Sequence, residues 1–156
     1  MAHDTAATGP APDAGWRVVR IDHVGIAVGD IEAAVRFHTD VLGLVEIHRE
    51  SNAEQAVIEV MLAAPGDASG AQVQLLAPAG PQSPIARFLD RRGPGIQQLA
   101  YTVDDVAAAG AALRARGLRV LYDEPRRGTA GSLVNFIHPA DAGGVLVELV
   151  QTSPRR

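Results

Sequence analysis

The sequence predicts an α+β fold, in which two tandem βαβββ modules form one curled mixed sheet around a cleft. Three observations predict it: an internal repeat, the same order of strand and helix patterns in both halves, and polar residues at matching places inside apolar strands. The repeat lays segment 21–44 over segment 96–118 and matches Ile21 with Ile96, Val28 with Val103 and Asp30 with Asp105. Because such a repeat indicates two copies of one supersecondary unit, it decides the architecture before any single motif does.

The first module spans about residues 18–77 and begins with an apolar run of strand length from Ile21. Asp30 follows at a helix N-cap position, and Gly43 suits a left-handed cap where that helix ends. One face of the helix is formed by Ile31, Ala34, Val35, His38 and Leu42. Three more strands are predicted over 45–49, 56–62 and 72–76.

A connector over 78–95 separates the modules, and its Pro and Gly residues bracket a short helix from about Pro84 to Arg91. The second module, about 96–152, repeats the pattern with Asp105 as N-cap and with Val106, Ala109, Gly110 and Leu113 on the helix face. Its later strands are predicted over 120–122, 133–137 and 145–150. Open sheet edges are satisfied when the two sheets curl together, with the helices outside and a cleft within.

Length and composition bound the class of protein. We predict one domain over 16–152, between a disordered tail at 1–15, rich in Ala, Gly, Pro and Thr, and a polar tail at 153–156. The net charge is -4, and the basic residues form no stripe, which argues against nucleic acid as a partner. No apolar run reaches the roughly 20 residues that cross a bilayer. The absence of cysteine agrees with a cytoplasmic protein.

Four polar residues interrupt apolar strands at places that the repeat relates to one another. His23 matches Gln98, and Gln74 matches Glu148. A buried polar group without a partner costs about 1–3 kcal/mol, so four of them at matched positions need a common partner, and a metal ion would satisfy all four. The alternative is that each is separately hydrogen-bonded in the core, or faces solvent from the polar side of its strand.

Five segments carry a family resemblance: DHVGIAV, QLLAP, SPIARFLDRRGPGIQQLAYTVDD, EPRRGTAGS and FIHPADAGGVLVELV. They are similar to the methylmalonyl-CoA epimerase family of the vicinal-oxygen-chelate (glyoxalase/bleomycin-resistance/dioxygenase) superfamily, over about residues 21–150. The resemblance implies a homodimer, a divalent metal held by four side chains and an acyl-CoA substrate. It also implies that (R)- and (S)-methylmalonyl-CoA are interconverted through a metal-stabilised enolate. Methylmalonyl-CoA and ethylmalonyl-CoA are not distinguished by it.

Carried over by position, the resemblance makes His23, Gln74, Gln98 and Glu148 the metal ligands. The chain departs from the commoner pattern at Gln98, since it has GIQQLA where the family has GIHHIA. An amide oxygen is a harder and weaker donor than imidazole, which shifts preference away from Zn²⁺. We therefore expect Co²⁺ first, with Mn²⁺, Mg²⁺, Ni²⁺ and Zn²⁺ as alternatives.

The resemblance also places catalytic and substrate-binding residues. It makes Glu59 the base that removes the α-proton, although the pattern alone also fits an outward-facing strand residue. Glu148 is a candidate acid or base for the opposite face. Arg126 and Arg127 are expected in a loop, where they would either bind a CoA phosphate or the substrate carboxylate, or remain solvated surface charges.

Other functions of the same fold stay open as alternatives, because fold alone does not decide function. A ring-cleaving iron dioxygenase needs two histidines and one carboxylate, and only His23 is available at the matched positions. A metal-free protein that sequesters small molecules, or another lyase or isomerase, remains an alternative. His38 and His48 are predicted at the surface, and His138 in a turn before Pro139.

Overall fold

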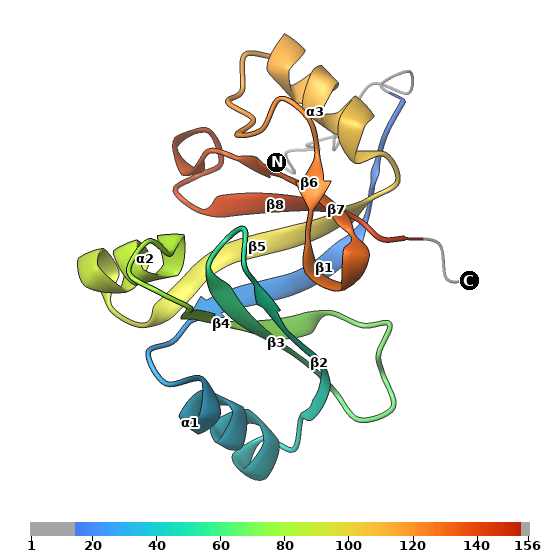
Figure 1. The fold of residues 1–156 in the computed structure, drawn as a ribbon. Helices are drawn as coiled ribbons and strands as arrows, with labels where there is room; N and C mark the ends of the chain where they lie inside the picture. Colours follow the sequence, from blue (N-terminus) through green and yellow to red (C-terminus); the bar gives the residue numbers. More distant parts are fainter. Residues whose placement is uncertain (1–14, 154–156) are drawn as a thin grey trace, which may run out of the picture.

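In the computed structural model, which describes residues 15–153, the chain forms a single eight-stranded mixed sheet with helices outside it (Figure 1). The strand order is β2-β3-β4-β1-β5-β8-β7-β6. This confirms the predicted α+β class and the curled sheet; the predicted tails lie almost wholly outside the described residues. The strands are β1 Val18–Ala27, β2 Val45–Asn52, β3 Val57–Ala63, β4 Gln72–Pro78, β5 Gly95–Val103, β6 Arg126–Arg127, β7 Leu133–Ile137 and β8 Leu146–Gln151. The helices are α1 Ile31–Arg36, α2 Pro84–Arg92 and α3 Val106–Ala115.

The sheet repeats its arrangement about the central pair of strands. Strands β1 and β5, which open the two halves of the repeat, are antiparallel neighbours. Each has the last strand of its own module beside it in parallel, β4 beside β1 and β8 beside β5. The two modules therefore join along their first strands into one continuous sheet.

Helices α1 and α3 begin as the sequence predicts. The carboxylates of Asp30 and Asp105 accept hydrogen bonds from backbone N–H groups three residues later, at 3.0 and 2.9 Å. Gly43 and Gly117, which follow the helical segments, have φ of 74° and 84°, in the left-handed region that favours glycine. Capping thus sets both ends of each helical segment in the two halves of the repeat.

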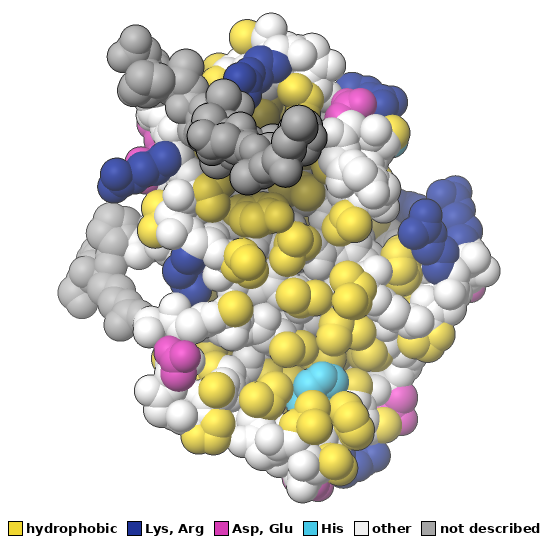
Figure 2. Space-filling view, turned by 180° about the vertical axis from the view of Figure 1, so that it is seen from behind, with side chains coloured by type: hydrophobic (Ala, Val, Ile, Leu, Met, Phe, Trp, Pro, Cys, Tyr) yellow, Lys and Arg dark blue, Asp and Glu magenta, His cyan; other side chains and the backbone are white. Residues whose placement is uncertain are grey.

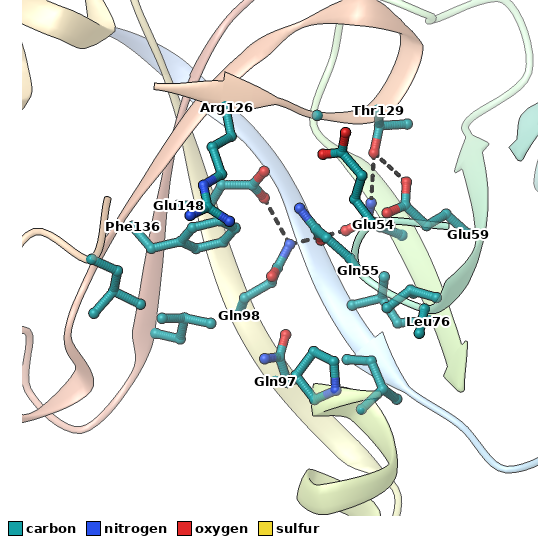
Figure 3. Close-up of a pocket in the computed structure, with 18 of the residues that line it drawn as sticks. Glu54, Gln55, Glu59, Leu76, Gln97, Gln98, Arg126, Thr129, Phe136 and Glu148 are labelled. Atoms are coloured by element: carbon teal, nitrogen blue, oxygen red, sulfur yellow. Dashed lines mark hydrogen bonds between the residues drawn. The ribbon is translucent and has the colours of Figure 1, made fainter. Parts of the chain in front are cut away.

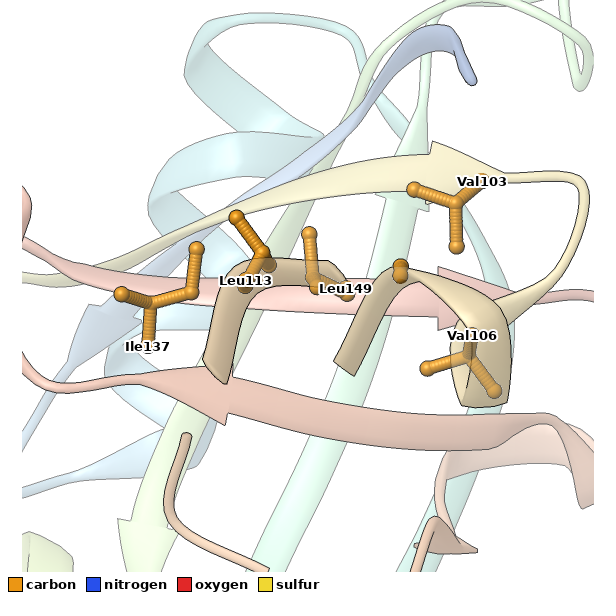
Figure 4. Close-up of a cluster of buried hydrophobic side chains, with 6 residues drawn as sticks. Val103, Val106, Leu113, Ile137 and Leu149 are labelled. Carbon is orange, nitrogen blue, oxygen red and sulfur yellow. The ribbon is translucent and has the colours of Figure 1, made fainter. Parts of the chain in front are cut away.

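The helices bury their apolar faces against the sheet. In the second module the predicted face of α3 is buried, and Figure 4 shows Val106 and Leu113 packed with Ile137 and Leu149 of β7 and β8. In the first module Val35 packs against β3 and β4, but Leu42 is 56% exposed. The prediction for Leu42 is wrong because α1 ends at Arg36 and continues as a π-helical turn, Phe37–Val41, which changes the angle between successive side chains.

The predicted strand over 120–122 is also wrong. Val120 makes only an isolated bridge to Ile137, and a two-residue edge strand forms later, at Arg126–Arg127. The cause is Asn135, whose side-chain amide accepts from the backbone N–H of Tyr122 at 3.1 Å and donates to its carbonyl at 2.9 Å. The side chain of Asn135 thus takes the backbone hydrogen bonds of Tyr122 that a neighbouring strand would otherwise take, so the segment at Tyr122 forms no strand. Within residues 15–153, no helix has the length and apolar character needed to cross a membrane.

Candidate active site

A cavity of about 500 Å³ lies against the sheet and receives side chains from both modules. Glu59, Gln74, Gln98 and Glu148 line it, from β3, β4, β5 and β8. Figure 3 shows Glu148 and Glu59 on opposite sides, with Gln98 between them. Its floor towards α2 is made by Pro84, Ile85 and Gln97. The cavity therefore depends on the pairing of the two halves and exists in neither alone.

The four predicted metal-site residues come together at one point. The side-chain nitrogen of Gln98 lies 2.7 Å from Glu148 Oε2, 3.0 Å from Gln74 Oε1 and 3.4 Å from His23 Nε2. His23 Nε2 lies 3.0 Å from the same Glu148 oxygen. All four residues are between 2% and 7% exposed. The structure thus brings together residues that are as far apart in the sequence as His23 and Glu148.

Strand register explains this convergence. Gln74 of β4 and Gln98 of β5 both pair with Gly25 of β1, from the two sides. A Cβ added to Gly25 would lie 2.4 Å from Cγ of Gln98, so any larger residue would displace that side chain. In the second module Glu148 pairs with Ala100, the residue that the repeat matches to Gly25. Small residues on the central strands therefore make room for the longer polar side chains.

His23 is held by a second carboxylate. Its Nδ1 lies 2.8 Å from Asp22 Oδ1, and Thr102 donates to the other oxygen of Asp22 at 2.6 Å. Burial lowers the pKa of His23, but the hydrogen bonds and charges of Asp22 and Glu148 outweigh it and raise the pKa to about 9. For Asp22 the effects have the opposite signs. Burial raises the pKa of its carboxyl, but the hydrogen bonds from His23 and Thr102 outweigh burial and bring the pKa below its usual value.

The side chains present fit a divalent ion, with a particular donor set. Imidazole nitrogen, two amide oxygens and a carboxylate face one point, once the amide group of Gln98 is rotated about the Cγ–Cδ bond to present its oxygen. The carboxylate on the far nitrogen of His23 is the usual arrangement behind a metal-ligating histidine. Among residues 15–153, no three His, Cys, Asp or Glu side chains gather around one point, so an ion here would depend on the two amides.

Glu59 lies across the cavity from this cluster and is only 4% exposed. The hydroxyl of Thr129 donates to its carboxylate, and the same hydroxyl accepts from Gln74 at 3.2 Å. On the neighbouring strand, Glu50 is its direct cross-strand partner. Burial raises the pKa of Glu59, and the charges of Glu50 and Glu148 raise it further, against the hydrogen bond from Thr129. A buried carboxylate with these neighbours is suited to accept a proton.

The two predicted arginines lie in different surroundings. They stand in the edge strand β6, so the predicted loop is wrong, and both are exposed. Arg126 lines the cavity, with its guanidinium carbon 3.9 Å from the centre of the Tyr122 ring. Figure 3 shows it beside Glu148 and Phe136. Arg127 is not among the residues that line this cavity.

His38, His48 and His138 are where the sequence places them. His38 and His48 are half-buried at the surface, and His48 bonds to Glu50 at 2.5 Å. His138 accepts a hydrogen bond from the backbone N–H of Ala140 in the turn that follows it. Sequence reasoning missed Asp22 and Thr129. Asp22 could have been found, because an acidic residue directly before a candidate ligand histidine is a signal for a supporting carboxylate. Thr129 could not, because it lies in the second module and contacts Glu59 of the first only in the folded chain.

Comparison with known proteins gives the family. The model of the family described as "Glyoxalase/Bleomycin resistance protein/Dioxygenase superfamily" matches residues 22–136 of this chain. The chain is 37% identical over 137 residues to the mitochondrial methylmalonyl-CoA epimerase of Mus musculus, covering 87% of this chain and 75% of the mouse protein. The crystal structure of methylmalonyl-CoA epimerase from Mycobacterium tuberculosis is 53% identical, with a TM-score of 0.83, covering 88% of this chain and 90% of that one.

A second solved structure is similar to this chain over nearly all of its own length. It is a variant of the Streptomyces coelicolor methylmalonyl-CoA epimerase in complex with 2-nitronate-propionyl-CoA, 42% identical with a TM-score of 0.83, covering 88% of this chain and 99% of that one. Fold and relatives agree: the chain belongs to the methylmalonyl-CoA epimerase family of the glyoxalase/bleomycin resistance protein/dioxygenase superfamily.

Proposed function

We propose that this chain is a metal-dependent epimerase that interconverts (R)- and (S)-methylmalonyl-CoA by moving the proton next to the thioester carbonyl. The observation that carries the proposal is the pair of buried carboxylates, Glu59 and Glu148, on opposite sides of one cavity (Figure 3). Epimerisation requires a proton to leave one face of a carbon and a proton to return on the other. Groups that act as base and acid must therefore reach the same carbon from two sides.

Glu59 is the proposed base for one face. Its ionised form accepts the α-proton, and Thr129 holds the carboxylate in place through its hydroxyl. Glu148 is the proposed acid or base for the opposite face, and it belongs to the proposed ligand set as well. Arg126 is the proposed partner of the free carboxylate of the substrate, and its place in the lining of the cavity beside Glu148 supports this role.

His23, Gln74, Gln98 and Glu148 are the residues that would hold a divalent ion. When bound, such an ion supplies Lewis-acid stabilisation of the negative charge that develops on the thioester oxygen. Co²⁺ is the first expectation because two of the donors are amide oxygens and only one is a nitrogen. The relatives in the M. tuberculosis and S. coelicolor structures share the fold and support the same reaction here.

The test is exchange of the α-proton of methylmalonyl-CoA with deuterium in D₂O, followed by NMR. The protein is first stripped with a chelator and then supplied with Co²⁺. The proposal expects rapid exchange with Co²⁺ and a large loss of exchange after stripping. Equal exchange in the stripped and loaded protein would remove the metal from the proposal, and no exchange in either would remove the reaction.

We also propose a homodimer. Figure 2 shows apolar side chains gathered over the face opposite the view of Figure 1. The exposed apolar residues of the chain include Ile21 of β1 and Ile96 of β5, at 51% and 65%, and Val41, the last residue of the turn after α1, at 69%. A contiguous apolar surface of this kind is suited to an isologous contact with a second copy. Light scattering at micromolar concentration should give twice the chain mass; the mass of one chain would end this proposal.

A further inference from the structure

A separate cavity of about 210 Å³, here called the His23 cavity, also reaches the candidate metal cluster. His23 lines it and is not among the residues that line the first cavity, the one of about 500 Å³. Gln74 and Gln98 line only the first cavity, whereas Glu148 and Thr129 line both. The cluster therefore stands between two cavities, with the two amides facing one and the imidazole facing the other.

The His23 cavity has its own opening to solvent. Its lining includes Ala68, in the loop between β3 and β4, and Thr152, directly after β8, and both residues are exposed. Neither of them lines the first cavity. With about 210 Å³ against about 500 Å³, the His23 cavity is the smaller of the two. The first cavity is therefore the one suited to a thioester, and the His23 cavity is suited to a ligand as small as an ion.

The wall between the two cavities is fastened on both sides. It includes the turn Thr129–Gly131. Thr129 donates to Glu59 and accepts from Gln74 at 3.2 Å, towards the first cavity. The next residue, Ala130, lines the His23 cavity, and its backbone N–H donates to Glu50 at 3.2 Å. These bonds keep the cavities apart, so each has its own route to the cluster.

The positive groups of the His23 cavity are paired with carboxylates. Arg20 donates to Asp22 Oδ2 at 3.1 Å and to two backbone carbonyls of the loop between β3 and β4. His23 lies between Asp22 and Glu148, with its ring nitrogens 2.8 and 3.0 Å from their oxygens. Asp22 and Glu148 both line this cavity as well. Because each positive group has a carboxylate beside it, no uncompensated positive charge among the described lining residues opposes the entry of a cation.

An ion at the cluster needs such a route. The four candidate ligands are between 2% and 7% exposed, so an ion reaches them only through a cavity. We propose that the divalent ion enters and leaves through the His23 cavity, while the acyl-CoA thioester enters through the first cavity. This inference rests on the ligand set of the proposed function. Under it, ion and thioester approach the cluster from different sides and do not have to pass one another.

The test obstructs the His23 cavity at its exposed end and measures exchange of Co²⁺, which needs no turnover. Ala68→Trp and Thr152→Trp each add a large ring at an exposed lining residue. Uptake is followed by stopped-flow absorbance of the bound cobalt, and release by transfer to the coloured chelator 4-(2-pyridylazo)resorcinol. Both rates should fall by about tenfold or more with an unchanged calorimetric Kd, because an obstruction raises the barriers to entry and exit equally.

Ala71→Trp is the matched control. It adds the same ring to the same loop, at an exposed residue that lines neither cavity, and should leave both rates and Kd unchanged. Unchanged exchange rates in both Ala68→Trp and Thr152→Trp, with the fold intact by circular dichroism, would overturn the proposed route. So would slower release that a lower Kd fully accounts for, because the ring would then act on the ligands and not on the passage.

The outcomes separate this inference from the proposed reaction. Slower uptake and release at constant Kd support the route even if methylmalonyl-CoA is not epimerised. Co²⁺ that binds tightly but exchanges equally fast in all variants overturns the route and leaves the proposed metal site in place. A protein that binds no Co²⁺ overturns the route and the proposed ligand set together.

Discussion

Replacing Glu59 by Gln separates the proposed base from a structural carboxylate. The change keeps the volume of the side chain and an oxygen that accepts the hydrogen bond from Thr129, but it removes the group that takes a proton. Glu59 lies directly opposite Glu50 on the neighbouring strand, and like charges in that arrangement destabilise a sheet by about 0.2–1 kcal/mol. The substitution therefore tests catalysis without removing a stabilising interaction.

The sign of the stability change follows from the pKa of Glu59. Burial, aided by Glu50 and Glu148, raises this pKa in the folded protein above the ordinary value of 4.5. The folded state then keeps the proton to higher pH than the unfolded state, and stability falls as pH rises between the two pKa values. At a pH above the raised pKa, ionised Glu59 costs stability, so Glu59→Gln should have a melting temperature there equal to or above that of the unaltered protein.

The rate should change in the opposite sense. Positioned acid–base groups contribute about 10²- to 10⁴-fold, and we expect a loss of that size in deuterium exchange at C2 of methylmalonyl-CoA with saturating Co²⁺. In the unaltered protein, kcat/KM should decline as pH falls through the raised pKa of Glu59, because only the ionised form is a base. Glu50→Gln is the matched control: exchange persists, and this acid limb moves to lower pH because one neighbouring charge is gone.

Wild-type-like exchange in Glu59→Gln would refute the assignment of the base and leave Glu148 as the next candidate. A low rate accompanied by a lower melting temperature would refute the stability argument, since it would show that the carboxylate supports the fold. A Glu50→Gln variant as inactive as Glu59→Gln would show that the pair acts as one unit and that the control residue shares the role.

Three further predictions concern the cluster around His23. Gln98→His should tighten Co²⁺ binding in a calorimetric titration, because imidazole is the stronger donor, and unchanged affinity would place Gln98 outside the ligand set. Glu148→Gln should lose metal affinity as well as rate, since it removes the one anionic ligand; full affinity by the same titration would contradict that role. Gly25→Ala should lower Co²⁺ affinity and destabilise the protein by about 1–3 kcal/mol in urea unfolding, because its Cβ would meet Gln98 at 2.4 Å; wild-type values for both would show that Gln98 has room to move.

The sequence predicts the modules and their common site well, because these depend on short-range patterns repeated twice. Helix caps such as Asp30, the apolar face of α3 and the strand that carries Gln74 are local signals, and each is confirmed as local structure. The convergence of His23 with Glu148 follows from the repeat, since matched strands meet where two modules pair.

Features that depend on one chain segment crossing another escape such reasoning. Asn135 replaces a strand pairing near Tyr122 through its side chain, and nothing in the local sequence distinguishes it from a polar strand residue. Thr129 reaches Glu59 from the other module, so its role needs the assembled fold. The register between β1 and β5 shifts at Gln97, because Gly25 pairs with Gln98 and Ile26 pairs with Ile96. The apolar patterns of the two strands do not specify a shift of one residue.

The most direct measurement of the central claim starts from pure (R)-methylmalonyl-CoA in D₂O with the Co²⁺-loaded protein and follows both epimers by NMR and mass spectrometry. If Glu59 and Glu148 move a proton between the two faces of the α-carbon, the (S)-epimer appears with deuterium at C2, and the mixture reaches equal amounts of the two epimers. An unchanged (R)-epimer after prolonged incubation, or an (S)-epimer that still carries the original hydrogen, would contradict the account.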